Sequence, residues 1–251
     1  MTAYPVSWHS KYGEMTFRSA EVILARLRQL RAFDSFLEVG CGNAHWSSAA
    51  MKLGCSRVHA VDGPWNKPEE LLIPRECYET RRIDEQFSVE GTFDLAVCLE
   101  VAEHVDQKHA MTLVSALTGA SDLVLFAAAI PHQGGYGHIN EQWPSWWAEK
   151  FMLKGFVPFD IVRPFAWGDD RLHYWYRQNT VLYVRQDSTE KLHDELGRFV
   201  NWSADGIVRD LVHPEKYNAF AEHDQVSLGK LAAKLPRHIW GRAKSLLPLG
   251  K

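Results

Sequence analysis

The sequence of 251 residues lacks the features that mark secreted, membrane-spanning or strongly basic proteins. Its cysteines, Cys41, Cys55, Cys77 and Cys98, include no C-x-x-C pair, which predicts reduced, buried thiols in a cytosolic protein and no disulfide framework. No stretch approaches the ~18 apolar residues of a membrane span, and no apolar run lies near the first residues, so neither a spanning helix nor a secretion signal is expected. The net charge of -3 gives no global reason to expect a nucleic-acid partner.

The rest of the composition is typical of a globular protein with one large core. Hydrophobic residues make up 46% of the chain and charged residues 24%, and the sequence has neither an internal repeat nor a low-complexity linker. We therefore expect one domain with elaborations. The expected parts of the chain are an N-terminal helical extension over residues 1–33, a central domain over 34–186, and a helical, basic C-terminal extension over 187–251.

A glycine-rich segment at residues 36–45 organises the central domain. Residues 36–39 (FLEV) form an apolar run with one acid, Glu38, and Gly40 and Gly42 then permit a tight turn before a helix-forming stretch at 44–53. This pattern predicts a buried strand, a turn and a helix, so that backbone N–H groups and a helix N-terminus face a ligand. A glycine turn of any parallel α/β protein is the alternative.

The spacing of the small residues discriminates between ligands. A dinucleotide fingerprint requires G-x-G-x-x-G, and His45 at the third glycine position disfavours a nicotinamide-dependent oxidoreductase. The segment instead has the form G-x-G-x-small, with Ala44 as the third small residue and Glu38 two residues before the first glycine. In this form it resembles the first motif of the class I S-adenosylmethionine-dependent methyltransferases. Carboxylates around the turn suit a ligand that has a cationic amino-acid group and no phosphate.

The resemblance implies that S-adenosylmethionine is the cofactor. Asp62, twenty residues after Gly42, would end the neighbouring strand, where an acid can accept hydrogen bonds from both ribose hydroxyls; a turn aspartate before Gly63 is the alternative. Asp84 resembles the acid near the adenine amino group in this family. The implied cofactor-binding residues are Glu38, Gly40, Cys41, Gly42, Asp62, Asp84 and Leu99.

Strand and helix patterns alternate along the chain at the interval of a parallel sheet. Two near-continuous apolar runs, 93–99 and 121–130, predict strands covered on both faces, with a helix over 101–117 between them. We expect an α/β fold with a Rossmann-like, doubly wound, mostly parallel seven-stranded sheet and an antiparallel last strand, as in the class I methyltransferases. The other expected elements are helices at 16–31 and 143–154 and strands at 57–61, 76–83, 156–162 and 180–185.

Residues 100–104 (EVAEH), after the fourth expected strand, contain the most informative polar side chains. On a helix, positions i, i+3 and i+4 share one face, so Glu100, Glu103 and His104 are expected to converge beside the methyl donor. Two neighbouring carboxylates repel one another unless a proton or a cation lies between them, and a divalent ion would resolve that conflict. The alternatives are a solvated first helical turn for the acids and a core position for the histidine.

A later histidine, His138, completes an E-x-x-E-H…H pattern. It resembles the metal site of small-RNA 3′-terminal 2′-O-methyltransferases and a similar motif of ubiquinone-pathway O-methyltransferases. The resemblance implies an ion that binds two acceptor oxygens and lowers the pKa of the attacking hydroxyl. The short spacing between His104 and His138 and the lack of a recognisable basic RNA-binding region differ from what an RNA-modifying enzyme of this kind would show. The implied ligands of the ion, magnesium or manganese with zinc or cobalt as competitors, are Glu100, Glu103, His104 and His138.

A metal-free reaction is the alternative at the same residues. His138, or His104, would then act as the catalytic base, because an imidazole titrates near neutral pH, and Glu103 lies beside them in the motif. His132 and His173 are secondary candidates for the base.

Aromatic residues crowd between positions 143 and 175. The segment IPHQGGYGHINEQWPSWW, followed by RLHYWYRQN, looks like methyltransferases of bacterial cell-surface polysaccharide or other sugar-modifying pathways. We therefore expect a sugar or glycan hydroxyl as the acceptor, with packing as the alternative role of several rings. The candidates are Trp143, Trp146, Trp147, Trp167 and Trp175 for contacts with sugar C–H groups, and Gln133, Asn140, Arg171, Gln178 and Asn179 for hydrogen bonds.

The segment from Gly229 onward contains no acid and alternates basic with apolar residues. It is expected either to bind an anionic membrane surface or a glycan-assembly partner, at the inner face of the membrane, or to pack on its own domain. The sequence thus predicts a cytoplasmic O-methyltransferase of a sugar or glycan. A methyltransferase of another small molecule or of an RNA 2′-hydroxyl, and a non-catalytic membrane-surface scaffold, are the alternatives.

Overall fold

The computed structural model describes residues 6–83, 85, 87–189 and 208–224. The chain divides into two compact units, Met1–His213 and Pro214–Lys251, and the described element of the second unit is helix α8 (Pro214–Asp224). None of the described helices is long and apolar enough to cross a bilayer. Asp84 and the basic segment from Gly229 onward lie outside the described residues.

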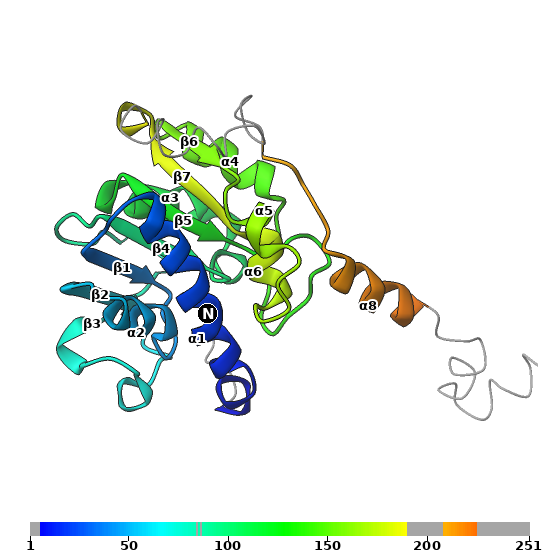
Figure 1. Ribbon diagram of the computed structural model, residues 1–251, viewed down its shortest axis with the longest axis horizontal. Coiled ribbons are helices and arrows are strands. Elements are labelled where there is room, and N and C mark those ends of the chain that lie inside the picture. Colours follow the sequence, from blue (N-terminus) through cyan, green and yellow to red (C-terminus); the bar gives the residue numbers. More distant parts are fainter. Residues whose placement is uncertain (1–5, 84, 86, 190–207, 225–251) are drawn as a thin grey trace, which may run out of the picture. The chain divides into compact units, whose positions relative to one another are not determined.

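The first unit is built on a seven-stranded sheet. Its strands are β1 (Ser35–Val39), β2 (Arg57–Asp62), β3 (Tyr78–Thr80), β4 (Leu95–Leu99), β5 (Leu123–Ala127), β6 (Phe156–Phe159) and β7 (Val181–Arg185). They lie in the order β3-β2-β1-β4-β5-β7-β6 (Figure 1). Strands β1 to β5 pair in parallel, whereas β7 is antiparallel to both neighbours, β5 and β6. The predicted Rossmann-like α/β fold with an antiparallel last strand is confirmed.

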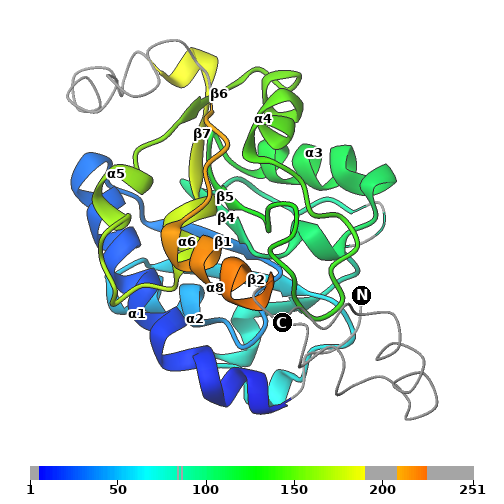
Figure 2. The same cartoon turned by 90° about the vertical axis from the view of Figure 1, so that its right-hand side faces the viewer.

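Helices cover both faces of this sheet (Figures 1 and 2). They are α1 (Val6–Leu30), α2 (His45–Lys52), α3 (Ala110–Ala120), α4 (Pro144–Met152), α5 (Arg163–Ala166) and α6 (Tyr174–Asn179). Helices α1, α2, α5 and α6 contribute to one hydrophobic cluster, and α3 and α4 contribute to the other. The sheet is therefore the middle of three layers.

Strand β4 shows why the apolar runs form doubly covered strands. All five of its residues are buried. Leu95, Val97 and Leu99 pack in the cluster of α1 and α2, while Ala96 and Cys98 pack in the cluster of α3 and α4. Because successive side chains of a strand point to opposite faces, a continuous apolar run supplies both layers at once.

The segment after β4 departs from the prediction. Instead of an α-helix over 101–117, two short 3-10 helices, Ala102–His104 and Gln107–His109, precede α3. Glu100 has a left-handed backbone with φ of 56°, and Val101 is also non-helical with φ of -130°, so no α-helix begins there. The prediction that Glu100, Glu103 and His104 share one α-helical face is therefore wrong.

The remaining differences concern where elements begin and end. Strand β3 is shorter than the expected 76–83, because Pro74 precedes a 3-10 helix at Arg75–Cys77 and β3 pairs only with β2. Helix α1 begins at Val6, ten residues before the expected start at 16. Its inner face, with Ala20, Ile23 and Leu24 fully buried, packs in the same cluster as α2.

A buried ion pair fastens α5 to the end of β6. The Arg163 side chain is 1% exposed, and its Nε donates to Oδ1 of Asp160 at 2.8 Å. Its Nη2 lies 2.7 Å from Oδ2 of the same carboxylate, and Nη1 donates to the carbonyl oxygen of Arg209 at 2.7 Å. The guanidinium thus joins three separate segments of the first unit.

We predict that Arg163→Met destabilises the protein by about 3–5 kcal/mol, because the charge of Asp160 would be left buried without its partner. A matched control is Arg171→Met, which removes an Arg–Asp pair with Asp169 whose arginine is 59% exposed, and it should cost at most about 1 kcal/mol. Urea denaturation followed by circular dichroism measures both free energies of unfolding. Equal losses in the two variants would contradict the prediction.

Candidate active site

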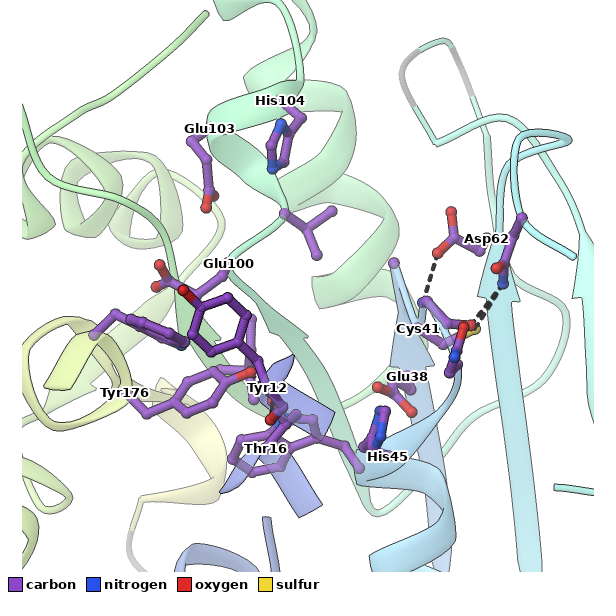
Figure 3. A pocket seen from close by; sticks show the side chains of 18 of the residues that line it. Tyr12, Thr16, Glu38, Cys41, His45, Asp62, Glu100, Glu103, His104 and Tyr176 are labelled. Carbon is purple, nitrogen blue, oxygen red and sulfur yellow. Dashed lines mark hydrogen bonds between the residues drawn. The ribbon is translucent and has the colours of Figure 1, made fainter. Parts of the chain in front are cut away.

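A cavity of about 410 Å³ opens at the carboxyl ends of β1, β2 and β4 (Figure 3). Its walls come from the turn after β1, the ends of β2 and β4, the loop at 133–138, and helices α1 and α6. The expected position of a ligand in an open α/β sheet, outside the carboxyl ends of the strands, agrees with this location.

The turn between β1 and α2 requires its glycines. Gly40 and Gly42 have φ of 78° and 49°, and the N–H groups of Gly40 and Cys41 both donate to the carbonyl oxygen of Val61 on β2. A Cβ at Gly40 would overlap the side chain of Val101, which follows β4. The tight glycine turn that the sequence pattern predicted is present, and it is closed onto both neighbouring strands.

Glu38 lies beneath this turn and supports the start of α2. It is 4% exposed, and its Oε2 accepts hydrogen bonds from the N–H and the hydroxyl of Ser47, at 2.8 and 2.5 Å. Burial raises the pKa of Glu38 to about 8 despite these hydrogen bonds. The side chain also lines the cavity, so a cation beside it would stabilise its ionised form. Ser47 was not identified from the sequence.

Asp62, at the end of β2, connects two turns. Its Oδ2 accepts from the N–H of Gly42 at 2.7 Å, and its Oδ1 accepts from the N–H of Gly63 at 2.6 Å and from Nε1 of Trp65 at 2.8 Å. Burial raises its pKa, which the three donors oppose. Asn66 adds a hydrogen bond from Nδ2 to the carbonyl oxygen of Gly42 at 2.6 Å. Sequence reasoning missed Trp65 and Asn66, since neither is part of a recognisable motif.

The structure gathers most of the predicted cofactor residues at one side of the cavity. Glu38, Gly40, Cys41, Gly42, Asp62 and Leu99 all line it, and Figure 3 shows Glu38, Cys41 and Asp62 on the same side. Asp84 lies outside the described residues, but the neighbouring Ile83 lines the cavity.

Glu100 lies at the centre of the cavity wall with its carboxylate held by two amides. Gln133 donates from Nε2 to its Oε2, and Asn179 donates from Nδ2 to its Oε1, both at 2.8 Å. Burial raises the pKa of Glu100 to about 7, which these two donors oppose. Glu100 was predicted as a metal ligand, but it lies outside the group of potential ligands formed by Glu103, His104 and His138.

In that group, one potential ligand atom of each residue lies within 4.8 Å of the others. Glu103 is 1% exposed, and its Oε2 has no hydrogen-bond partner among the described residues, while Oε1 lies 3.9 Å from Nε2 of His138. Burial, reinforced by the charge of Glu100, raises the pKa of Glu103, whereas burial beside His138 lowers the pKa of His104 to about 4. A buried carboxylate oxygen without a partner, beside two imidazoles, suits a divalent cation.

The other nitrogen of each imidazole faces a hydrogen-bond acceptor. Nδ1 of His138 lies 2.8 Å from Oε1 of Glu141, and Nδ1 of His104 lies 3.1 Å from the carbonyl oxygen of Gly137. In a neutral ring, a proton on Nδ1 would donate to this acceptor and leave the lone pair on Nε2. Such outer contacts are those that orient metal-binding histidines. Glu141 and Gly137 were not identified as part of the site from the sequence.

Backbone contacts bring His138 to this group. The N–H groups of Ile139 and Asn140 donate to the carbonyl oxygen of Glu103, at 2.9 and 3.0 Å. A Cβ at Gly135 would overlap the His138 ring, so the loop passes close to the imidazole only because glycine is present. A loop contact of this kind has no periodicity by which the sequence could reveal it.

An aromatic wall lies beside Glu100. It consists of Tyr12 from α1 and Tyr174, Trp175 and Tyr176 from α6, all of which line the cavity. Tyr12 meets Trp175 edge to face with centroids 5.7 Å apart, and Trp46 meets Tyr176 in the same way at 5.2 Å. The interlocking rings hold one another in place.

Of the five candidate tryptophans, only Trp175 lines the cavity, and the alternative role in packing is seen for others of the set. Trp147 packs in the core against Phe126 with centroids 5.0 Å apart, and Trp167 packs against His213 at 4.7 Å. Of the predicted hydrogen-bonding residues, Gln133 lines the cavity, and Asn179 donates a hydrogen bond to Glu100. Neither His132 nor His173, the secondary base candidates, lines it.

Comparison with protein families gives one match. Residues 12–163, more than half of the chain, match the family described as a methyltransferase domain. None of the curated proteins compared with the chain matches it.

Solved structures with similar folds are diverse methyltransferases. SAM-bound CalS10, an amino pentose methyltransferase from Micromonospora echinaspora, is 12% identical with a TM-score of 0.52, covering 74% of this chain and 99% of that one. Magnesium protoporphyrin IX methyltransferase from Synechocystis PCC 6803 with bound SAM is 14% identical with a TM-score of 0.47, covering 69% of this chain and 79% of that one. The methyltransferase domain of bacterial CtHen1 is 14% identical with a TM-score of 0.47, covering 66% and 97%. At these identities the likeness concerns the fold alone.

We predict that Gly40→Ala weakens binding of S-adenosylhomocysteine at least roughly tenfold, because the new methyl group would collide with Val101 and alanine would be strained at the left-handed φ that glycine adopts freely. Gly155→Ala is the matched control: its φ of 74° is similar, but a Cβ there meets nothing within 4 Å. Isothermal titration calorimetry measures both affinities. Normal binding by Gly40→Ala would show that this turn does not contact the ligand.

Proposed function

The chain belongs to the methyltransferase-domain family, whose methyl donor is S-adenosylmethionine, and we propose that it is an O-methyltransferase acting on a hydroxyl of a sugar or related polyol. One observation supports this above the others. A continuous cavity joins the glycine turn after β1 to Glu103, His104 and His138. Donor and acceptor would therefore meet in a shared space.

In this proposal the turn side of the cavity binds the donor. Gly40, Cys41 and Gly42 present backbone to it, Asp62 accepts from the ribose, and Glu38 contributes negative charge beside the cationic amino acid portion. The sulfonium methyl is already activated, so the main task of the protein is to align it with the acceptor oxygen. The rest of the task is to remove the proton of the attacking hydroxyl.

A divalent ion fits the residues on the other side. Glu103 offers a buried oxygen without a partner, and His104 and His138 offer lone pairs on Nε2. A set of one carboxylate and two imidazoles suits manganese better than magnesium, which prefers oxygen ligands. When bound, such an ion acts as a Lewis acid that lowers the pKa of an acceptor hydroxyl. Glu141 and Gly137 would keep both rings oriented toward it.

A metal-free variant of the reaction has support from one contact. The 2.8 Å hydrogen bond between His138 Nδ1 and Glu141 orients the imidazole. In that case Nε2 of His138 takes the proton of the acceptor hydroxyl directly.

The acceptor class rests on the shape and lining of the cavity. The aromatic wall lines the cavity, where rings would lie against sugar C–H groups. An RNA 2′-hydroxyl is disfavoured, since none of the described residues lining the cavity is Lys or Arg, the residues that bind phosphates. A role at a membrane surface depends on the basic segment from Gly229 onward.

Methyl transfer is tested with purified protein, S-adenosylmethionine with a labelled methyl group, and a panel of sugars, polyols, short RNA and quinone precursors. We expect label in a polyhydroxylated acceptor, with manganese stimulating turnover and chelator suppressing it. His138→Ala should lower the rate at least about 100-fold, since it removes both an ion ligand and the candidate base. Transfer to RNA alone would contradict the proposal, and full turnover after chelation would favour the metal-free variant.

Metal binding is tested independently of activity. We predict that Glu103→Gln weakens manganese binding at least about tenfold, because an amide replaces the only carboxylate of the group. Glu149→Gln, an exposed acid on α4, is the matched control and should bind as the unaltered protein does. Electron paramagnetic resonance of free manganese gives both affinities. Unchanged binding in Glu103→Gln would rule out this site.

A further inference from the structure

The lining of the cavity is strongly acidic. Four carboxylates, those of Glu38, Asp62, Glu100 and Glu103, line it, and none of the lining residues in the described part of the chain is Lys or Arg. Buried charges are stable only when they are paired or hydrogen-bonded. Positive charge brought by a ligand would therefore stabilise the ionised forms of these carboxylates, and negative charge would oppose them.

The proposed donor and ion do not supply enough positive charge to balance four ionised carboxylates. S-adenosylmethionine has a sulfonium, an ammonium and a carboxylate, and so brings one net positive charge, and a divalent ion brings two. Against four carboxylates, all ionised once these cations lie beside them, one negative charge remains. An acceptor with a phosphate or carboxylate would increase this excess, whereas an acceptor with one ammonium group would neutralise it.

Glu100 is the carboxylate best placed to meet such a group. Glu38 lies on the turn side with Ser47, Asp62 accepts three hydrogen bonds from its own turns, and Glu103 belongs to the proposed ion site. Glu100 lies on the side of the cavity away from Asp62 (Figure 3), and its carboxylate is oriented by amides that approach from Gln133 and Asn179. Its left-handed backbone keeps it out of the neighbouring 3-10 helix.

The aromatic wall adds a second element of cation recognition. Figure 3 shows Tyr12 and Tyr176 on the same side of the cavity as Glu100, away from Cys41 and Asp62. Ring faces attract an ammonium group that lies over them, and the attraction is larger when water is excluded. A carboxylate beside fixed aromatic rings is therefore suited to a protonated amine.

We propose that the acceptor is an amine-bearing polyol, such as an amino sugar, whose ammonium group is bound by Glu100 and the aromatic wall while a hydroxyl lies beside Glu103, His104 and His138. The inference rests on the proposed function and narrows its substrate class. The proposal disfavours phosphorylated or nucleotide-linked sugars as acceptors, because such acceptors would bring anionic groups to an acidic wall.

The test compares glucosamine, glucose and glucuronate, which differ mainly in charge, as ligands of protein saturated with S-adenosylhomocysteine. Calorimetry at a pH below the pKa of the glucosamine amine measures each affinity. We expect glucosamine to bind at least about tenfold more tightly than glucose, and glucuronate to bind more weakly than glucose. Glucose binding as tightly as glucosamine would overturn the inference, as would the failure of glucosamine to bind.

Variants identify the residues responsible. In Glu100→Gln the affinity ratio of glucosamine to glucose should fall to near one, and in Tyr12→Leu, which leaves the carboxylate in place, it should fall partway. Glu149→Gln should keep the full ratio. A full ratio in Glu100→Gln would overturn the assignment. Saturation with S-adenosylhomocysteine is measured first on each sample, so that loss of donor binding, which contradicts the proposed function, is distinguished from loss of amine preference alone.

Discussion

The close contact between Gly40 and Val101 sets the distance between the two sides of the cavity. Gly40 belongs to the turn after β1 and Val101 to the segment after β4, and there is no room for even a Cβ between them. Val101 directly follows Glu100, whose left-handed backbone leads the chain into the 3-10 helix of Glu103 and His104. The donor turn and the acid–imidazole group are therefore positioned by one packing contact between neighbouring strand ends, and both depend on a glycine at position 40.

The buried acids show how the protein stabilises a negative cavity without basic residues. Glu38 accepts from Ser47, Asp62 accepts from backbone and indole N–H groups, and Glu100 accepts from two amides. In each case fixed neutral donors replace water around the carboxylate. Oε2 of Glu103 lacks such a donor among the described residues. This difference is the physical basis for placing a cation at Glu103 and for expecting positive charge in the molecules that enter.

The aromatic residues illustrate how far composition alone can mislead. Trp147 lies at a buried position of α4 and fills the layer between α3, α4 and the sheet, as a large apolar ring in a helix usually does. Four of the rings that line the cavity come instead from α1 and α6, two helices far apart in the sequence that meet where Tyr12 contacts Trp175. The proposed recognition of the acceptor by these rings would thus depend on the docking of α1, which the sequence pattern treats as an extension.

Local sequence determined the sheet and the glycine turn. An apolar run such as LAVCL must be covered on both faces, and a G-x-G turn between a strand and a helix has few conformations, so β4 and the turn after β1 were predictable, whereas the antiparallel last strand was expected from the resemblance to the class I methyltransferases. Only the tertiary structure decided how Glu100, Glu103, His104 and His138 divide their roles. A left-handed residue at 100, a loop that hydrogen-bonds to the backbone of Glu103, and two amides from distant segments separate Glu100 from the other three. These contacts join residues far apart in the chain, and no spacing within a single segment encodes them.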